Sequence, residues 1–159
     1  TREMRFYAGI TLTLFLTACS SSPSFHGAPS FLWPVKKGRI SQNFKSGSKR
    51  HDGLDISGTK NTPILATASG RVLYAGREFN GYGKLIIIEH RGDTWASFYG
   101  HLNRISVREG QRVFKGQKIG LMGRTGRATG VHLHFEIRYN LRPVNPLNLL
   151  DNKSYLSSR

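Results

Sequence analysis

Short apolar stretches separated by glycine turns run through most of this chain. Six segments have the length and composition of β-strands, namely residues 71–76, 84–90, 94–101, 104–110, 112–123 and 131–139. Residues 85–88, Leu-Ile-Ile-Ile, form a continuous apolar run typical of a strand buried on both faces. No segment has the spacing of a convincing amphipathic helix. We therefore predict a mainly β protein with an antiparallel β-sheet or sandwich.

Residues 131–139, with the sequence VHLHFEIRY, alternate between polar and apolar side chains. A strand here would place His132, His134 and Glu136 on one face and apolar side chains on the other. Two imidazole rings would then point into the same space. The alternative is that both histidines simply lie on a wet sheet face.

Three more side chains could join these histidines. His51 and Asp55, in HDGLD, lie an even number of residues apart, so an extended segment presents both on one side, and Gly53 leaves room for close approach of another backbone. His101 follows in YGHL. A catalytic zinc ion takes three ligands from His and carboxylate groups and keeps one position for water. The set suits a zinc centre, although each residue alone could be an ordinary surface or core residue.

The motifs HDGLD, YGHL and HLHFE and the strand-like segments between them, in their order along residues 31–150, resemble those of the lysostaphin/LytM-type zinc metallopeptidases. That family cuts peptide cross-links in bacterial cell walls. The resemblance implies a fold of the duplicated-hybrid-motif type, with a groove that holds one Zn²⁺ per chain. By the same resemblance, His51, Asp55 and His134 would bind the metal. His101 and His132 would be catalytic, orienting or deprotonating the metal-bound water and stabilising the oxyanion; which does which is left open.

Other segments would shape the groove. Residues 123–130, GRTGRATG, are expected to form a loop along one wall, and residues 109–120 a small hairpin that packs under the site. Tyr99, two residues before His101, would share its strand face and could support the oxyanion. A tyrosine that fills a half-buried sheet is the alternative.

The N-terminal segment predicts secretion and lipid attachment. Residues 6–19 are apolar for about the length of a signal peptide and too short to span a bilayer. Residues 16–19, LTAC, resemble a bacterial lipobox, so we expect a signal peptide at residues 1–18, with an N-terminal extension at residues 1–3, and lipidation of Cys19. An inert thiol is the alternative. Residues 19–30 would be a flexible tether. By resemblance to lipoprotein sorting rules, Ser20 in place of Asp would favour the outer membrane, facing the periplasm, in a Gram-negative host.

The formal net charge of +15 raises the question of a nucleic-acid partner. Without Arg2, Arg5 and Glu3, 22 basic and 8 acidic residues remain, a net charge of +14. The secretory signal and the scattered positions of the basic residues argue against nucleic acid. We expect cell-wall carboxylates, wall or lipid phosphates and anionic headgroups as partners. Simple solubility would explain any single lysine equally well.

Residues 31–150 are therefore expected to be one LytM-type peptidase domain, followed by a tail at residues 151–159. The expected function is a zinc metalloendopeptidase that acts on peptidoglycan peptide stems in the cell envelope, most directly a D,D-endopeptidase. The alternative is a non-catalytic LytM-type regulator that activates another wall hydrolase, such as an amidase. A third reading is an envelope lipoprotein that only holds the wall to the membrane. Retention of all five site residues favours the enzyme.

Overall fold

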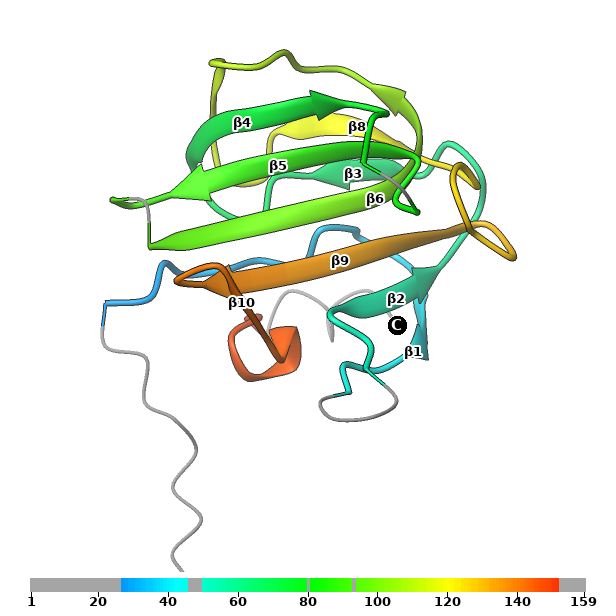
Figure 1. The fold of residues 1–159 in the computed structure, drawn as a ribbon, viewed down its shortest axis with the longest axis horizontal. Helices are drawn as coiled ribbons and strands as arrows, with labels where there is room; N and C mark the ends of the chain where they lie inside the picture. The colour runs from blue at the N-terminus through cyan, green and yellow to red at the C-terminus, as the bar shows by residue number, and fades with distance from the viewer. Residues whose placement is uncertain (1–26, 46–49, 80, 93, 152–159) are drawn as a thin grey trace, which may run out of the picture.

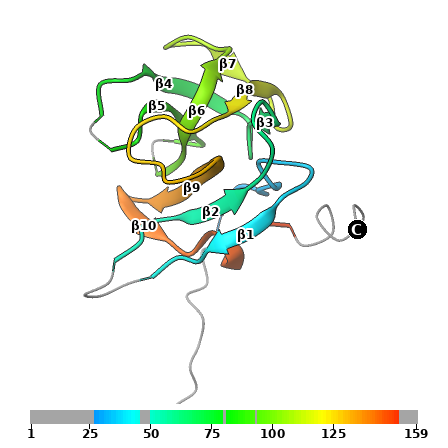
Figure 2. The same ribbon diagram turned by 90° about the vertical axis from the view of Figure 1, so that its right-hand side faces the viewer.

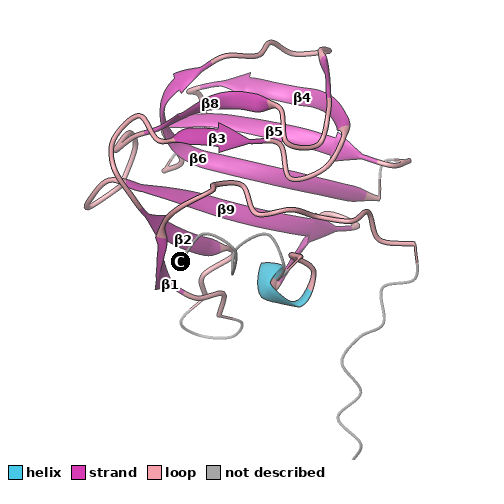
Figure 3. Cartoon of the chain, turned by 180° about the vertical axis from the view of Figure 1, so that it is seen from behind, coloured by secondary structure: helices cyan, strands magenta, loops and turns pink. Residues whose placement is uncertain are grey.

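The computed structural model describes residues 27–45, 50–79, 81–92 and 94–151, and strands dominate this part of the chain (Figure 1). The elements of the described residues are β1 (Arg39–Gln42), β2 (Leu54–Ser57), β3 (Pro63–Leu65), β4 (Gly70–Gly76), β5 (Lys84–His90), β6 (Trp95–Ile105), β7 (Arg112–Val113), β8 (Lys118–Met122), β9 (His132–Tyr139), β10 (Arg142–Val144) and the 3-10 helix η1 (Pro146–Asn148). Figure 3 shows this helix as a single cyan turn below β9. The pairings between these strands are antiparallel, which confirms the predicted mainly β fold.

One strongly bent sheet organises the molecule. Its order is β1-β2-β9-β6-β5-β4-β7, with β10 on β9, while β8 pairs with both β3 and β6. The centre is β6, an 11-residue strand that pairs with β5 and β9 and, through its second half, with β8. The register shifts between Leu102 and Arg104, and such irregularities bend a strand. In Figure 2, β3, β7 and β8 accordingly lie on the opposite side of the molecule from β1, β2 and β10.

The core is centred on β6 and on its two neighbours in the sheet, β5 and β9. The apolar run of β5 is buried from Leu85 to Ile88, which confirms the prediction of a strand covered on both faces. Tyr99 of β6 and Phe135 of β9 are both fully buried, and their ring centroids lie 5.5 Å apart. The beginning and the end of residues 31–150 lie side by side, because Phe31 and Leu150 form a parallel bridge.

Two local predictions are wrong. Residues 104–110 were expected to form one strand, but only the first two belong to β6. Residues 109–120 do not form a hairpin, because β7 pairs with β4 whereas β8 pairs with β3 and β6. The tight turn from Phe114 to Gln117 connects β7, which lies beside β4, to β8, which lies between β3 and β6. Strands β1, β3 and β10 were not anticipated, since each has only three or four residues.

Several predictions concern residues outside the described part. The signal peptide, Cys19 and most of the tether fall within residues 1–26, and nearly all of the tail falls within residues 152–159. Among the described residues, no helix is long and apolar enough to cross a membrane.

Candidate metal centre

Three predicted ligands converge between β2 and β9. Asp55 of β2 is paired in register with His134 of β9, and His51 lies just before β2 in a bridge with Lys45. One ligand atom from each of His51, Asp55 and His134 lies within 4.8 Å of the others. A Cβ atom at Gly53 would lie 2.4 Å from the carbonyl oxygen of Phe135, so the close approach of β2 to β9 requires glycine here.

The other two predicted residues border the same space. The rings of His101 and His132 are 4.7 Å apart, and those of His101 and His134 are 5.9 Å apart. His132 Nε2 lies 3.8 Å from Asp55 Oδ2. His101 has a φ of +60°, a conformation uncommon outside glycine, which turns it from the regular alternation of β6. The structure therefore brings all five predicted residues together.

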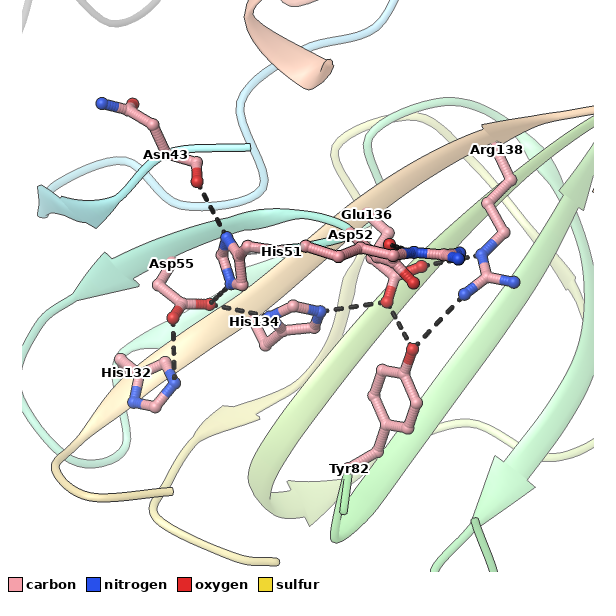
Figure 4. A network of polar contacts seen from close by, with 10 residues as sticks. Asn43, His51, Asp52, Asp55, Tyr82, His132, His134, Glu136 and Arg138 are labelled. Carbon is pink, nitrogen blue, oxygen red and sulfur yellow. Dashed lines mark hydrogen bonds and ion pairs between the residues drawn. The ribbon is translucent and has the colours of Figure 1, made fainter. Parts of the chain in front are cut away.

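Hydrogen bonds orient the imidazole rings toward a common centre. The Nδ1 atoms of three histidines lie against backbone carbonyl oxygens: His51 against Asn43 at 2.9 Å, His101 against Thr125 at 2.8 Å and His132 against Gly130 at 3.0 Å. A carbonyl only accepts hydrogen bonds, so each Nδ1 carries the proton and each Nε2 keeps its lone pair. Figure 4 shows His51 and His132 meeting the carboxylate of Asp55.

The donor set fits a zinc ion. His51 Nε2 is buried and makes no hydrogen bond, although Asp55 Oδ1 is only 3.1 Å away. A buried polar atom without a partner is costly, and coordination of a cation would satisfy it. Two imidazoles and one carboxylate match a zinc site that has three protein ligands. The residues that would hold the ion are His51, Asp55 and His134.

A buried carboxylate holds the other side of His134. Glu136 is fully buried, and its Oε1 lies 3.0 Å from His134 Nε2. The hydroxyl of Tyr82 donates to the same oxygen, and Arg138 Nε donates to Oε2 at 2.7 Å (Figure 4). The guanidinium of Arg138 also lies 4.3 Å from the ring centroid of Phe98. With Nε2 bonded to Glu136, Nδ1 of His134 is the nitrogen that faces Asp55 and the metal position.

Charge pairing sets the ionisation of this cluster. Burial alone would raise the pKa values of Asp55 and Glu136, but hydrogen bonds from His134 and the nearby cations outweigh it and lower both pKa values. Burial lowers the pKa of His134, yet its hydrogen bonds to Asp55 and Glu136 outweigh burial and raise it to about 9. Burial lowers the pKa of His101, and the neighbouring histidines lower it further. In the absence of metal, His134 is thus an imidazolium between two carboxylates.

For Tyr99 the structure favours the alternative, a tyrosine that fills the sheet. Its side chain is fully buried, and its hydroxyl accepts hydrogen bonds from Thr67 N and Ser97 Oγ, both at 2.9 Å. The positive φ of His101 explains why the two side chains do not share one strand face, because strict alternation between positions 99 and 101 fails there. The tyrosine beside the centre is instead Tyr82.

Sequence reasoning also missed the supporting roles of Glu136, Arg138 and Tyr82. The signal for the first two was present, because the alternation that places His132 and His134 on one face continues through both residues. Tyr82 comes from the segment between β4 and β5, which no local pattern connects to β9.

A shallow cavity opens beside the centre. Its volume is about 230 Å³, and its lining includes Tyr82, His101, His134 and Arg127. Arg127 belongs to residues 123–130, as expected of a loop along one wall. The backbone N–H of Arg127 donates to the backbone carbonyl of Gly81 at 3.0 Å, and this bond connects the loop to the opposite side of the cavity.

The mainly β fold and the His-Asp-His set together define a protein of the lysostaphin/LytM type. Residues 49–146 match Peptidase family M23, and the chain belongs to that family, which confirms the expected resemblance. A solved structure described as a zinc containing peptidase from Vibrio cholerae superposes with a TM-score of 0.69 at 35% identity, covering 73% of this chain and 39% of the other.

Curated relatives carry names that describe regulators and lipoproteins. The chain is 44% identical to "Murein hydrolase activator NlpD" of Salmonella dublin over 140 residues, 87% of this chain and 36% of the relative. It is 47% identical to "Lipoprotein NlpD/LppB homolog" of Pseudomonas aeruginosa over 118 residues, 74% of this chain and 39% of the relative. The chain thus spans somewhat more than a third of the length of these relatives.

These relatives correct the expectation of an active endopeptidase. That expectation took retention of the five site residues as evidence of hydrolysis, yet relatives such as the Salmonella dublin protein are named as activators of a murein hydrolase. The physical reason for the error is that the retained residues report the capacity to bind a metal. Hydrolysis further requires a substrate held in reacting geometry, which no ligand set provides.

Proposed function

We propose that this chain is a non-catalytic regulator of the bacterial cell envelope that activates a murein hydrolase. The observation that carries the proposal is 44% identity, over 87% of this chain, to a protein named as such an activator. Membership of Peptidase family M23 supports a role at peptidoglycan. The basic mature chain supports contact with the carboxylates of peptide stems.

In this proposal the metal centre maintains the shape of the regulator. Zinc held by His51, Asp55 and His134 would cross-link β9 to β2 and to the segment that precedes β2. Binding to the folded state alone stabilises that state. His101, oriented by the carbonyl of Thr125, lines the adjacent cavity, whereas His132, oriented by the carbonyl of Gly130, has its Nε2 3.8 Å from Asp55 Oδ2.

The proposal also includes location and domain limits. Cys19 carries the lipid, the signal peptide of residues 1–18 is removed, and Ser20 directs the protein to the outer membrane of a Gram-negative host, facing the periplasm. The name of the Pseudomonas aeruginosa relative supports lipid attachment. Residues 19–30 connect the lipid to the M23 domain at residues 31–150, and residues 151–159 follow as a tail.

The test is a reconstitution with purified peptidoglycan. The mature chain, a murein hydrolase of the same host and the two together are incubated with sacculi, and released muropeptides are resolved by mass. We expect faster release by the hydrolase when the chain is present and no products from the chain alone. His134→Ala, which removes one proposed ligand, should weaken the stimulation. Unchanged hydrolase rates, or cleavage by the chain alone, would contradict the proposal.

A further inference from the structure

A second cavity, of about 470 Å³, is lined by residues at the start of β4 and just after β5. In Figure 1 these strand ends lie at the left, whereas the start of β9, which carries His132 and His134, lies at the right. Three arginines, Arg71, Arg91 and Arg112, line it together with one carboxylate, Glu89, and the ring of Phe114. We call it the arginine pocket. Its excess of positive charge gives it the character of an anion site.

Strand pairing concentrates this charge. Arg71 of β4 lies directly opposite Arg112 of β7 in an antiparallel register. Like charges directly opposite each other destabilise a pair of strands. Glu89 of β5 faces Arg71 from the other side, so one carboxylate is set against three guanidinium groups. A bound anion would relieve the remaining repulsion.

The backbone brings the third arginine to this position in an uncommon conformation. Arg91 has a φ of +35° and is followed by Gly92 at +68°. Glycine and asparagine are the usual residues in the left-handed region, so the turn itself does not favour a long cationic side chain. An uncommon conformation kept in place is a reason to look for a function of that side chain.

An apolar ring accompanies the cations. Phe114 is 74% exposed although the turn that carries it is well held, because Phe114 N donates to Gln117 Oε1 at 3.0 Å. The next residue, Lys115, donates from its backbone to Ser69 Oγ and from Nζ to Ser30 Oγ. Exposed aromatic and basic side chains together are typical of surfaces that lie at a membrane interface.

The pocket also lies where the chain enters the domain. In Figure 1 the blue start of the described chain is at the same left-hand end as the arrowhead of β5, which immediately precedes Arg91. Ser30, which Lys115 contacts, is only eleven positions after Cys19. A fully extended segment of that length reaches at most about 40 Å.

From these observations we infer that the arginine pocket binds the phosphate of an anionic phospholipid headgroup, with Phe114 at the acyl boundary. The placement of the pocket near the membrane rests on the proposed lipidation of Cys19. The inference adds a direct contact between the domain and the membrane. Tyr139 lies at the pocket end of the sheet, because it pairs with Trp95, which in turn pairs with His90. His132, at the other end of β9, is roughly 23 Å from Tyr139 along the strand and would therefore lie away from the bilayer.

The experiment uses the mature chain without its lipid, residues 19–159 with Cys19→Ser. Binding to vesicles of phosphatidylcholine, with and without phosphatidylglycerol, is measured by co-sedimentation at about 0.15 M salt. The pocket variant Arg91→Gln/Arg112→Gln is compared with Arg39→Gln/Arg104→Gln, which removes the same charge from exposed positions on β1 and β6. Each arginine near an anionic surface contributes about fivefold in affinity, so the pocket variant should bind roughly 25-fold more weakly. The control should lose less than about threefold, because its arginines lie away from the headgroups.

A second readout is the fluorescence of Phe114→Trp. The native Trp33 and Trp95 are 5% and 2% exposed, so their emission should stay constant while that of the indole introduced at position 114 shifts to the blue on phosphatidylglycerol vesicles. Equal losses in the two double variants would overturn the inference, because general charge would then explain binding. Displacement by inorganic phosphate at the concentration of the lipid phosphate would also overturn it, since the site would then be one for soluble phosphate. Neither assay involves the metal or a murein hydrolase, so failure here would leave the proposed activation standing.

Discussion

Replacement of Glu136 by Gln tests how the buried carboxylate prepares His134 for metal. Glutamine keeps the shape of the side chain but removes its charge. In the native structure Glu136 accepts a hydrogen bond from the Nε2–H group of His134, so the proton of a neutral ring stays on Nε2 and Nδ1 is free for the metal. Asp55 competes for the same ring, because its Oδ1 lies 2.7 Å from Nδ1. Without the charge of Glu136, the neutral tautomer of His134 with its proton on Nδ1 becomes more populated, and that proton blocks coordination of the metal by Nδ1.

The expected magnitude follows from the role of such partners in other sites. Loss of a group that orients a metal ligand weakens metal affinity about 10- to 100-fold, or roughly 1.4–2.7 kcal/mol. The upper part of this range is appropriate here, because Glu136 is fully buried and bulk solvent cannot take over its role. Tyr82→Phe keeps the carboxylate and removes only one donor to it, so it should weaken zinc binding less than Glu136→Gln.

The assay is competition for zinc against a chromophoric chelator at constant pH, with circular dichroism to verify folding. Nitrogen-15 NMR of the imidazole rings reports the tautomer of His134 separately from affinity. Glu109→Gln is the matched control, because it removes the same charge from an exposed position. If folded Glu136→Gln binds zinc within about twofold of the native protein, then the reasoning about the tautomer is wrong.

Three further predictions concern the scaffold. Tyr99→Phe leaves the buried N–H of Thr67 without its acceptor and should destabilise the fold by about 1–3 kcal/mol in denaturant titrations, with unchanged zinc affinity; a loss of zinc binding would contradict its placement in the core. Burial lowers the pKa of His90, so the unfolded chain takes up a proton first and stability falls as the pH drops below about 6.5. His90→Gln should therefore lose less stability than the native chain in thermal melts of metal-free protein between about pH 7 and 5. Parallel curves of melting temperature against pH for the two proteins would refute this. Gly53→Ala brings a Cβ within 2.4 Å of the carbonyl of Phe135 and should lower stability by about 1–3 kcal/mol together with zinc affinity; native values of both would show that β2 can move away from β9 at little cost.

Local alternation predicted the parts of the fold in which one strand determines its own faces. The polar face of β9 is the best example, because period-2 alternation places His132 and His134 together whatever strands lie beside it. The apolar run of β5 likewise requires burial on both faces. HDGLD pointed to close backbone approach through Gly53, and the distance to Phe135 shows the reason.

Features that depend on distant partners could not be predicted in this way. The chain between Arg112 and Met122 resembles a hairpin locally, but its two strands find different partners across the sheet. Tyr99 enters the core because the backbone of His101 departs from the strand conformation, and no alternating pattern contains that departure. The five site residues were found by residue type. Their interpretation as an active site failed because a ligand set is enough to bind a metal, whereas hydrolysis also requires a substrate held in reacting geometry.

The placement of the metal centre limits where the proposed activator can act. If Cys19 is anchored and the arginine pocket lies on the bilayer, the distance to the His132 end of the sheet is set mainly by the length of β9, roughly 23 Å. Release of the pocket would add the reach of the tether, at most about 40 Å. Headgroup binding would therefore decide whether the regulator stays close to the membrane or extends toward the wall. A murein hydrolase that it activates would have to approach within the corresponding distance, and lengthening the tether should extend this range only while the pocket is free.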